Sequence, residues 1–419
     1  MVEKIKQALV NHKTLIQNFS YLSALQVFNM LIPLITYPYL IRVLGKETYG
    51  LIVYAQAIVG YLLILVSFGF NISATKDISV NRHNKEKLNE IVSSVLIIKS
   101  VLFVFALAIL FVALNFIPQA RDSKVLFYLT MWMCLYEVIF PIWYFQGIEQ
   151  MKYITYITLV SRITFFALIF VLIHEPSDYL FVPIINGVGA IIAGSASLYI
   201  IFKIHKIKLK KPLLSHLKQY CSDSFYLFLS TSSIQIVLNA NKIIIGTFLG
   251  LKEVAYYDLG QKILNLLKVP LAIVTQVLFP HISKTKDINL LNRLIIFTTI
   301  FTTISYFSLW IFSPYAVTIF AGSDMLEAVS IVRILCISFV LVGISQYLGS
   351  MRLIPYGYNK LYAYATTSTL LIYFILVLIA GTSNQINIIF LSWTSVFVDL
   401  WMVLIYVYYN SKKGILIKV

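Results

Sequence analysis

Charged residues are scarce in this sequence. Asp, Glu, Lys and Arg make up 12% of the 419 residues, whereas about 25% is usual in soluble globular proteins. Hydrophobic residues make up 59% of the chain, and its mean hydropathy is +0.85. So few charges cannot cover a soluble surface of this size, which excludes a cytosolic enzyme, a disordered chain and a secreted disulfide scaffold. A polytopic membrane protein remains.

Cysteine is also rare, and the chain lacks common catalytic and metal-binding motifs. Its three cysteines, Cys134, Cys221 and Cys336, are far apart and form no CxxC pair, so neither a zinc site nor a disulfide framework is supported. The six histidines do not cluster at ligand spacing. No GxxxxGK(S/T), HExxH or GxSxG motif is present. We therefore expect no enzyme, no cofactor and no metal site.

Long apolar segments are what the chain has instead. A transmembrane helix needs about 20 mostly apolar residues to cross ~30 Å of hydrocarbon, and backbone groups in lipid must be satisfied within the element, which favours helices. The first apolar segment follows three lysines and is too long for the core of a signal peptide, so we interpret it as a span. Twelve spans are predicted, at residues 15–40, 51–73, 91–117, 125–147, 154–174, 180–202, 223–249, 254–280, 294–316, 329–351, 361–381 and 387–409.

The distribution of basic residues predicts the orientation of these spans. An even number of spans puts both termini on one side. The flanks on that side hold 22 Lys and Arg residues, and the loops on the other side hold 5. By the positive-inside rule both termini are cytoplasmic. The net charge of +16 is therefore mainly a topology signal, and because the basic residues are scattered over seven flanks we expect no nucleic-acid partner.

The chain divides into two halves. The most basic flank, residues 203–222, lies near the middle of the sequence, and a Leu-Gly turn after the first span (Leu44-Gly45) recurs after the seventh (Leu249-Gly250). We expect an N-terminal lobe at 1–202, a basic cytoplasmic linker at 203–222 and a C-terminal lobe at 223–419. Six spans return the chain to its starting side, so the lobes would be parallel repeats. The expected fold is an all-α membrane protein with two six-helix lobes.

The predicted span 7 has a continuous polar face. Spacings of three and four residues put these side chains on one side of a helix; they are Thr231, Gln235, Asn239, Lys242 and Gly246. Lys242 lies about seven residues, or ~10 Å, from the outer end of the span. It either snorkels to the interface or lines a water-filled cavity, as ionisable residues inside membranes usually do.

Spans 8, 1 and 5 also contain polar residues. In span 8, Asp258 and Lys262 are spaced for pairing along the helix, whereas Lys268 has no such partner nearby in sequence. In span 1, Asn29 belongs to a polar face that either makes interhelical hydrogen bonds or contributes to a cavity. Arg162 lies well inside span 5 and is harder to explain by snorkelling.

Bases outnumber acids inside the spans. The six bases are Lys99, Arg162, Lys242, Lys262, Lys268 and Arg333, of which Lys99 and Arg333 lie near enough to span ends to snorkel. The three acids are Glu137, Asp258 and Asp399. A positive interior is costly in hydrocarbon unless it binds an anion, and Lys and Arg bind phosphate by charge and geometry. We expect a diphosphate and sugar cleft that includes Lys242, Arg162, Lys262, Lys268, Arg42, Gln235, Asn239 and Asn29.

The three acids are candidates for ion coupling. Asp258 has Lys262 one turn away and is expected to be ionised. Asp399 has Trp393 and Trp401 nearby in sequence, and the alternative for it is a structural role. Glu137 is the preferred candidate, because it lies one turn before Pro141, where a bend is expected, and has no base within one turn. The alternative is that a base on another helix, such as Arg162, neutralises it.

Four short segments carry a resemblance to a known family. Tyr39–Gly50 (YLIRVLGKETYG) resembles the first-loop motif of the polysaccharide biosynthesis, or polysaccharide transporter, family. Pro141–Met151 (PIWYFQGIEQM) resembles the end of its fourth span. Lys242–Gly246 (KIIIG) resembles the start of its second half, and Phe279–Ser283 (FPHIS) resembles the end of its eighth span. Within the family the resemblance is greatest to O-antigen flippases of bacterial inner membranes, which belong to the multidrug/oligosaccharidyl-lipid/polysaccharide exporter superfamily.

This resemblance implies two six-helix lobes around a central cleft, as in multidrug and toxic-compound extrusion (MATE) transporters. It also implies transfer of an undecaprenyl-pyrophosphate-linked oligosaccharide from the cytoplasmic to the periplasmic leaflet for lipopolysaccharide biosynthesis. Membrane lipids, an O-antigen polymerase and a chain-length regulator are the other partners that it suggests. One departure is Asn241, because many relatives have an acid beside the span 7 base; ion coupling at that position is therefore in doubt.

Three other functions remain as alternatives. A multidrug exporter of the same fold commonly carries organic cations, for which acids would be expected to dominate the cleft. A sugar symporter of the major facilitator type would have a GxxxD(R/K) signature in the loop 75–90, which is absent. An integral-membrane O-antigen polymerase or ligase would need a sizeable periplasmic loop, whereas the predicted outward loops are all short.

Overall fold

The computed structural model describes residues 2–382 and 386–414, and this part of the chain is helical, with no strand. It forms two compact units. Unit 1 consists of Met1–Leu44 and Ala55–Ser232, and unit 2 consists of Gly45–Tyr54 and Ser233–Val419. The short segment Gly45–Tyr54 of the first half of the sequence therefore packs with the second half.

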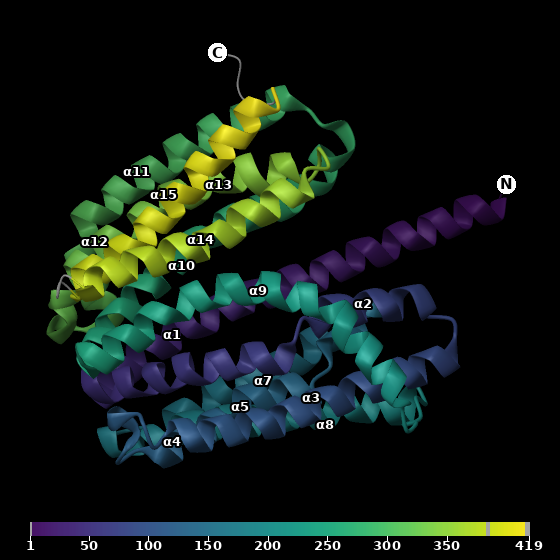
Figure 1. Cartoon of the computed structure of the whole chain (residues 1–419), viewed down its shortest axis with the longest axis horizontal. Helices are drawn as coiled ribbons and strands as arrows, with labels where there is room; N and C mark the ends of the chain where they lie inside the picture. The colour runs from purple at the N-terminus through teal and green to yellow at the C-terminus, as the bar shows by residue number, and fades with distance from the viewer. Residues whose placement is uncertain (1, 383–385, 415–419) are drawn as a thin grey trace. The chain divides into compact units, whose positions relative to one another are not determined.

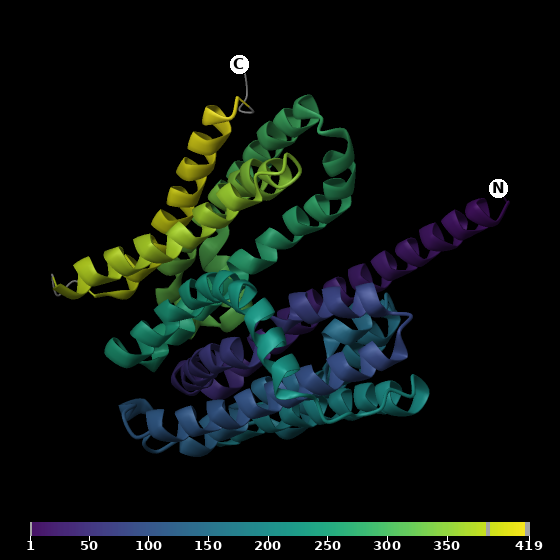
Figure 2. The same ribbon diagram turned by 45° about the vertical axis from the view of Figure 1, so that its right-hand side comes forward.

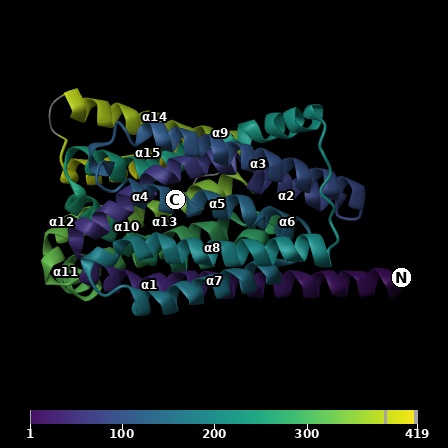
Figure 3. The same ribbon diagram turned by 90° about the horizontal axis from the view of Figure 1, so that it is seen from below.

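Unit 1 contains most of the helices from the first half of the sequence (Figure 1). In chain order they are α1 (Val2–Ser67), α2 (Phe70–Asn81), α3 (Lys85–Ala113), η1 (Pro118–Ala120), α4 (Lys124–Thr130), α5 (Trp132–Ile139), α6 (Ile142–Gly147), α7 (Met151–Leu172), η2 (Pro176–Leu180), α8 (Phe181–Tyr199) and the π-helical turn η3 (Ile200–Ile204). α8 packs on α5 and α7, and Figure 3 shows α7 and α8 running alongside each other.

Unit 2 is a second helical bundle. Its elements are α9 (Leu214–Phe248), whose first part belongs to unit 1, α10 (Leu251–Thr285), α11 (Ile288–Ala321), η4 (Ser323–Ala328), α12 (Val329–Leu335), α13 (Ile337–Leu348), the π-helical turn η5 (Gly349–Leu353), α14 (Asn359–Thr382) and α15 (Ile388–Lys412). α15 packs on α12, α13 and α14. Figure 2 shows α14 and α15 as neighbours, in yellow-green and yellow.

The described helices agree with a multi-pass membrane protein. Nine helical stretches within residues 2–382 and 386–414 are long and apolar enough to cross a membrane. One of them, Ala24–Asn81, is 58 residues long and contains a break at Gly45, where φ is 74°. It includes predicted span 2 (51–73) and the part of predicted span 1 (15–40) from Ala24 onward. α9 and α10, each of 35 residues, are not among these nine but coincide with predicted spans 7 and 8. The prediction of twelve spans is consistent with this arrangement.

Proline and glycine determine two local features of unit 1. The bend predicted at Pro141 is confirmed: the helix stops at Ile139 and resumes at Ile142, since proline has no N–H to donate. Gly147 lies against Ile78, where an added Cβ would approach the Ile78 side chain to 2.5 Å. A small residue therefore lets α6 and α2 pack closely, as is common between membrane helices.

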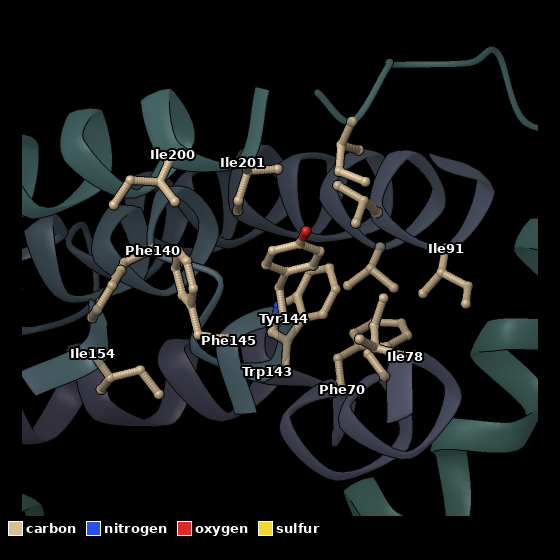
Figure 4. Packing of buried hydrophobic residues seen from close by; sticks show 14 of the residues in the cluster. Phe70, Ile78, Ile91, Phe140, Trp143, Tyr144, Phe145, Ile154, Ile200 and Ile201 are labelled. Carbon is tan, nitrogen blue, oxygen red and sulfur yellow. The ribbon is translucent and has the colours of Figure 1, made fainter. Parts of the chain in front are cut away.

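The core of unit 1 is rich in aromatic side chains. Figure 4 shows Trp143 and Tyr144 of α6 beside Phe70 and Ile78 of α2, with Phe140 and Phe145 nearby. Trp143 and Phe145 are completely buried. This packing fixes the ends of α2, α3 and α6 relative to one another, and it therefore fixes the side chains that those ends carry.

Candidate functional site

A cavity in unit 1 brings together two residues that the sequence singled out. It has a volume of about 260 Å³, and both Glu137 of α5 and Arg162 of α7 line it. α8 packs on both of these helices and contributes Asn186 to the wall. Trp132 and Tyr136, from the same helix as Glu137, also line the cavity. The two charged side chains thus reach one space from two different helices.

Glu137 has a cationic partner that sequence reasoning missed. The Lys99 ammonium, on α3, lies 2.7 Å from Glu137 Oε1, and the side chain of Lys99 is fully buried. Asn71 of α2 donates to the same oxygen at 3.0 Å. Our interpretation of Lys99 as a snorkelling residue is therefore wrong. The long lysine side chain points into the bundle, where burial of its charge requires a carboxylate partner.

Arg162 is left without a counter-ion. The alternative in which Arg162 neutralises Glu137 is not what the structure has, because Lys99 occupies that role. Among the residues that the structure describes, Arg162 forms no ion pair and no hydrogen bond. Lys99, Glu137 and Arg162 together carry one net positive charge. Ionisable groups at membrane depth usually serve a ligand or a pathway, and a guanidinium binds carboxylate or phosphate oxygens.

Other polar groups on the cavity wall have unused hydrogen-bonding capacity. The indole N–H of Trp132 is buried and has no partner among the described residues. Asn186 donates its Nδ2 to the Val182 carbonyl at 2.9 Å, which leaves its own carbonyl oxygen as an acceptor. Ser161 and Thr158 also line the wall. Aromatic rings beside hydroxyl, amide and charged groups form a surface that suits a polar, hydroxylated ligand.

A second charged cluster forms within unit 2. The carboxylate of Asp258, which is 3% exposed, accepts a bond from Lys242 at 2.8 Å and another from Lys262 at 2.5 Å. The Tyr49 hydroxyl donates to the same carboxylate at 2.7 Å and also contacts the Lys262 ammonium. The predicted pairing of Asp258 with Lys262 is present, and Lys242 shares the same acid. Two lysines and one aspartate leave one net positive charge here as well.

The segment Gly45–Tyr54 is held in unit 2 by close packing and polar contacts. An added Cβ at Gly50 would lie 1.8 Å from the Leu251 carbonyl oxygen, so only glycine fits there. Tyr54 hydrogen-bonds to Thr247 at 2.9 Å and packs against Gly246 of α9. These contacts place the Tyr49 hydroxyl at Asp258. Sequence reasoning missed Tyr49, because no local pattern links it to Asp258, which is 209 residues away in the chain.

Asn241 is the centre of an uncharged hydrogen-bond network. It is 1% exposed, and the two N–H groups of its Nδ2 face three acceptors, which are Tyr257 Oη at 2.8 Å, the Leu391 carbonyl at 2.9 Å and Ser395 Oγ at 3.0 Å. Its Oδ1 accepts from Tyr373 Oη at 2.8 Å. The network joins α9, α10, α14 and α15. A neutral amide can both donate and accept, and this arrangement uses both capacities.

The remaining predicted residues lie elsewhere. Lys268 of α10 interacts electrostatically with Asp399 of α15, although no ion pair forms between them. Asn239 donates to the Gln235 carbonyl along the exposed side of α9. In unit 1, Asn29 and Arg42 are exposed. The structure thus gathers Arg162 with Glu137 and gathers Lys242 and Lys262 with Asp258; it does not add Gln235, Asn239, Asn29 or Arg42 to either group.

Comparisons with a family profile and with curated proteins agree on the family of this chain. The profile of a family described as "Polysaccharide biosynthesis protein" matches residues 15–286. A protein of Escherichia coli (strain K12) named "Putative O-antigen transporter" is 30% identical over 84% of this chain and 86% of its own length. A protein of Shigella dysenteriae with the same name is 26% identical over 80% of this chain and 84% of its own length.

Solved structures of similar fold come from two kinds of transporter. One is titled "Lipid II flippase MurJ, inward closed conformation"; it has a TM-score of 0.74 at 18% identity and covers 94% of this chain and 87% of its own. Another is an inward-facing multidrug resistance MATE family transporter of the MOP superfamily, with a TM-score of 0.65 at 14% identity and coverage of 92% and 98%. The expected MATE-like all-α fold is thus confirmed.

Proposed function

Since the chain belongs to the polysaccharide biosynthesis protein family, we propose that it is a flippase for lipid-linked polysaccharide precursors. Its cargo would be undecaprenyl-pyrophosphate-linked O-antigen repeat units, carried from the cytoplasmic to the periplasmic leaflet of the bacterial inner membrane. The names of the two relatives from E. coli and Shigella support an O-antigen substrate. The fold, which is shared with a lipid II flippase, is compatible with such a cargo.

The observation that carries the proposal is the cavity guanidinium of Arg162. Its neighbour Glu137 is already paired with Lys99, so the cavity retains a positive charge inside a membrane-spanning bundle. Such a charge is costly unless an anion compensates for it. The proposed cargo provides both an anionic diphosphate and hydroxyl-rich sugars. Lys242 and Lys262 provide a second positive cluster, in unit 2.

The physical task is to lower the barrier to moving polar groups through hydrocarbon. Each polar group that crosses without a hydrogen-bond partner costs several kcal/mol, on the order of 2–7. A lipid tail can stay in the bilayer while the sugar and diphosphate pass through a polar path. No bond is made or broken in this process, so the protein acts as a transporter and not as an enzyme.

Net export needs an energy source. A periplasmic O-antigen polymerase, acting with its chain-length regulator, would draw transport forward by consuming the product. An ion gradient would instead need a titrating acid among Glu137, Asp258 and Asp399. Glu137 and Asp258 each have ammonium partners, whereas Asp399 forms no ion pair with a described residue. All three acids therefore remain candidates for ion coupling, and Asp399 is the one that no ion pair among the described residues holds.

A multidrug exporter is the second candidate, because the fold is also that of a MATE transporter. Organic cations would require acids that are free to bind them. The unit 1 cavity instead pairs its acid internally and leaves a base unpaired. Its charge favours an anionic cargo.

The test is a gene deletion complemented with variants, followed by measurement of lipid-linked oligosaccharide on each face of the inner membrane. We expect the deletion strain to accumulate it on the cytoplasmic face, the wild-type gene to restore export, and Arg162→Gln to restore it poorly. Arg333→Gln is the matched control, because Arg333 is an intramembrane arginine that bonds to Ser313 at 2.9 Å and lies outside the cavity. Normal distribution of the oligosaccharide in the deletion strain would contradict the proposed function.

A further inference from the structure

A second recess of unit 1 lies where several membrane-spanning stretches end. It has a volume of about 550 Å³. Its polar wall comes from three segments distant in sequence and consists of Arg82, His83, Lys85, Tyr144, Gln150 and His205. The neighbouring candidate spans end at Asn81, Gly147 and Ile204 and begin at Lys85 and Met151. The recess is therefore at the level of the lipid headgroups, on the side that the charge bias places in the cytoplasm.

The recess combines a basic rim with an apolar floor. Arg82 and Lys85 contribute positive charge, and no carboxylate is among the described residues of its lining. Glu149 pairs with Arg82 at 3.1 Å, but both side chains are about half exposed, where an ion pair is weak and easily exchanged. Leu88 and Ile207 are buried beneath the rim. Such a surface matches a lipid headgroup, whose phosphate is anionic and whose glycerol and acyl groups are apolar.

His205 can supply a hydrogen-bond donor to the recess that it lines. Burial and the nearby charge of Lys152 lower the pKa of His205 from its usual 6.5, so the imidazole is neutral at pH 7. Its Nδ1 lies 3.0 Å from the hydroxyl of the buried Tyr144. A neutral imidazole that accepts the phenol proton at Nδ1 carries its own proton on Nε2. This assignment of the tautomer makes Nε2–H available to a ligand.

The backbone beside the recess is in an uncommon conformation at two places. Glu149, next to Gln150, has φ 59°, and Lys206, next to His205, has φ 54°. Residues other than glycine rarely adopt positive φ, and such residues concentrate at functional sites, where they aim particular side chains. Here Gln150 and His205, each next to one of these residues, both line the recess.

We propose that this recess binds the phosphate of an anionic lipid headgroup in the cytoplasmic leaflet. A phosphate oxygen would accept from Lys85 and from His205 Nε2, while the glycerol backbone covers Leu88 and Ile207. The same chemistry is found in a membrane phospholipid and in the diphosphate of the proposed cargo. The site is separate from the Arg162 cavity, and lipid binding there does not depend on the protein being a flippase.

The first test is native mass spectrometry of the purified full chain with phosphatidylglycerol or zwitterionic phosphatidylcholine. We expect the wild-type protein to bind phosphatidylglycerol more tightly than phosphatidylcholine. Lys85→Gln should weaken the binding of phosphatidylglycerol about fivefold, the effect of one basic residue at a membrane surface. Arg121→Gln, which removes an exposed base outside the recess, is the matched control and should bind as wild type does. Equal binding of the two lipids, or a Lys85→Gln variant that binds as the control does, would overturn the proposal.

The second test measures the pKa of His205 in the wild-type protein, and a variant is needed only to assign the signal. The histidine pKa values are followed by NMR with labelled histidine, and His205→Gln identifies the signal. A bound phosphate favours the imidazolium, so phosphatidylglycerol should raise the pKa of His205, whereas phosphatidylcholine should not. If soluble pyrophosphate raises it and phosphatidylglycerol does not, the recess recognises the diphosphate of the cargo. If neither anion raises it, the recess is not a phosphate site. Transport is measured in neither test, so failure here leaves the proposed function untouched.

Discussion

The buried pair of Lys99 and Glu137 allows the most quantitative prediction. At 2.7 Å, with side chains 0% and 14% exposed, the two charges attract by about 6 kcal/mol at an effective dielectric constant of about 20. Desolvation offsets much of this, but removing one partner leaves the other charge buried and uncompensated. Lys99→Met should therefore lower the free energy of unfolding by about 3–5 kcal/mol.

A double-mutant cycle separates the pair from the rest of the packing. Glu137→Gln alone leaves the Lys99 ammonium without a counter-charge and should also destabilise the protein. The double variant Lys99→Met/Glu137→Gln has no unpaired charge at this site, so it should be more stable than the sum of the single effects predicts, by about 2–3 kcal/mol. The assay is SDS-induced unfolding of the purified chain in mixed micelles.

Lys87→Met is the matched control for this cycle. Lys87 pairs with Glu90 at 3.0 Å on the same helix as Lys99, but its side chain is 48% exposed, and such pairs contribute about 1 kcal/mol or less. The reasoning would be refuted if Lys99→Met cost no more than Lys87→Met, or if the effects of Lys99→Met and Glu137→Gln simply added.

Three further predictions address charge, topology and coupling. Lys242→Glu should reduce transport more than Lys242→Ala, because it places a second carboxylate beside Asp258; normal surface polysaccharide in a Lys242→Glu strain at native expression would exclude Lys242 from the site. Reporter fusions after Lys211 should report cytoplasm and those after Lys252 periplasm; a periplasmic signal at Lys211 would contradict the proposed lobe arrangement. In inverted vesicles, Glu137→Gln should abolish any dependence of transport on an imposed pH or Na⁺ gradient while substrate binding persists, and a full response of this variant would exclude Glu137 as the coupling acid.

Features that are local in sequence were predictable. The apolar segments gave the all-helical membrane fold, because a span of about 20 apolar residues is required by the bilayer alone. The interruption at Pro141 followed from the missing N–H of proline. The pairing of Asp258 with Lys262 followed from their separation by four residues on one helix.

Contacts between helices were not predictable in the same way. Lys99 and Glu137 are on helices whose relative rotation depends on the whole bundle, and position along a span does not reveal which way a side chain points. Tyr49 reaches Asp258 because Gly45–Tyr54 packs with the second half of the chain, an exchange that no local pattern indicates. The sequence identified Lys242 and Lys262 as bases inside predicted spans, in α9 and α10. Only the structure places both ammonium groups at the carboxylate of Asp258.

The central claim is that the purified protein alone moves a lipid-linked oligosaccharide across a bilayer, with Arg162 contacting the anionic or sugar part of the cargo. The most direct measurement reconstitutes the chain into liposomes with a fluorescent undecaprenyl-pyrophosphate-linked oligosaccharide and follows its exposure to an impermeant quencher. The account predicts that the wild-type protein accelerates transfer over protein-free liposomes. It also predicts that Arg162→Gln slows transfer by about tenfold, the effect of losing one charge-assisted hydrogen bond, while Arg333→Gln does not. Transfer by the wild-type protein no faster than in protein-free liposomes would contradict it.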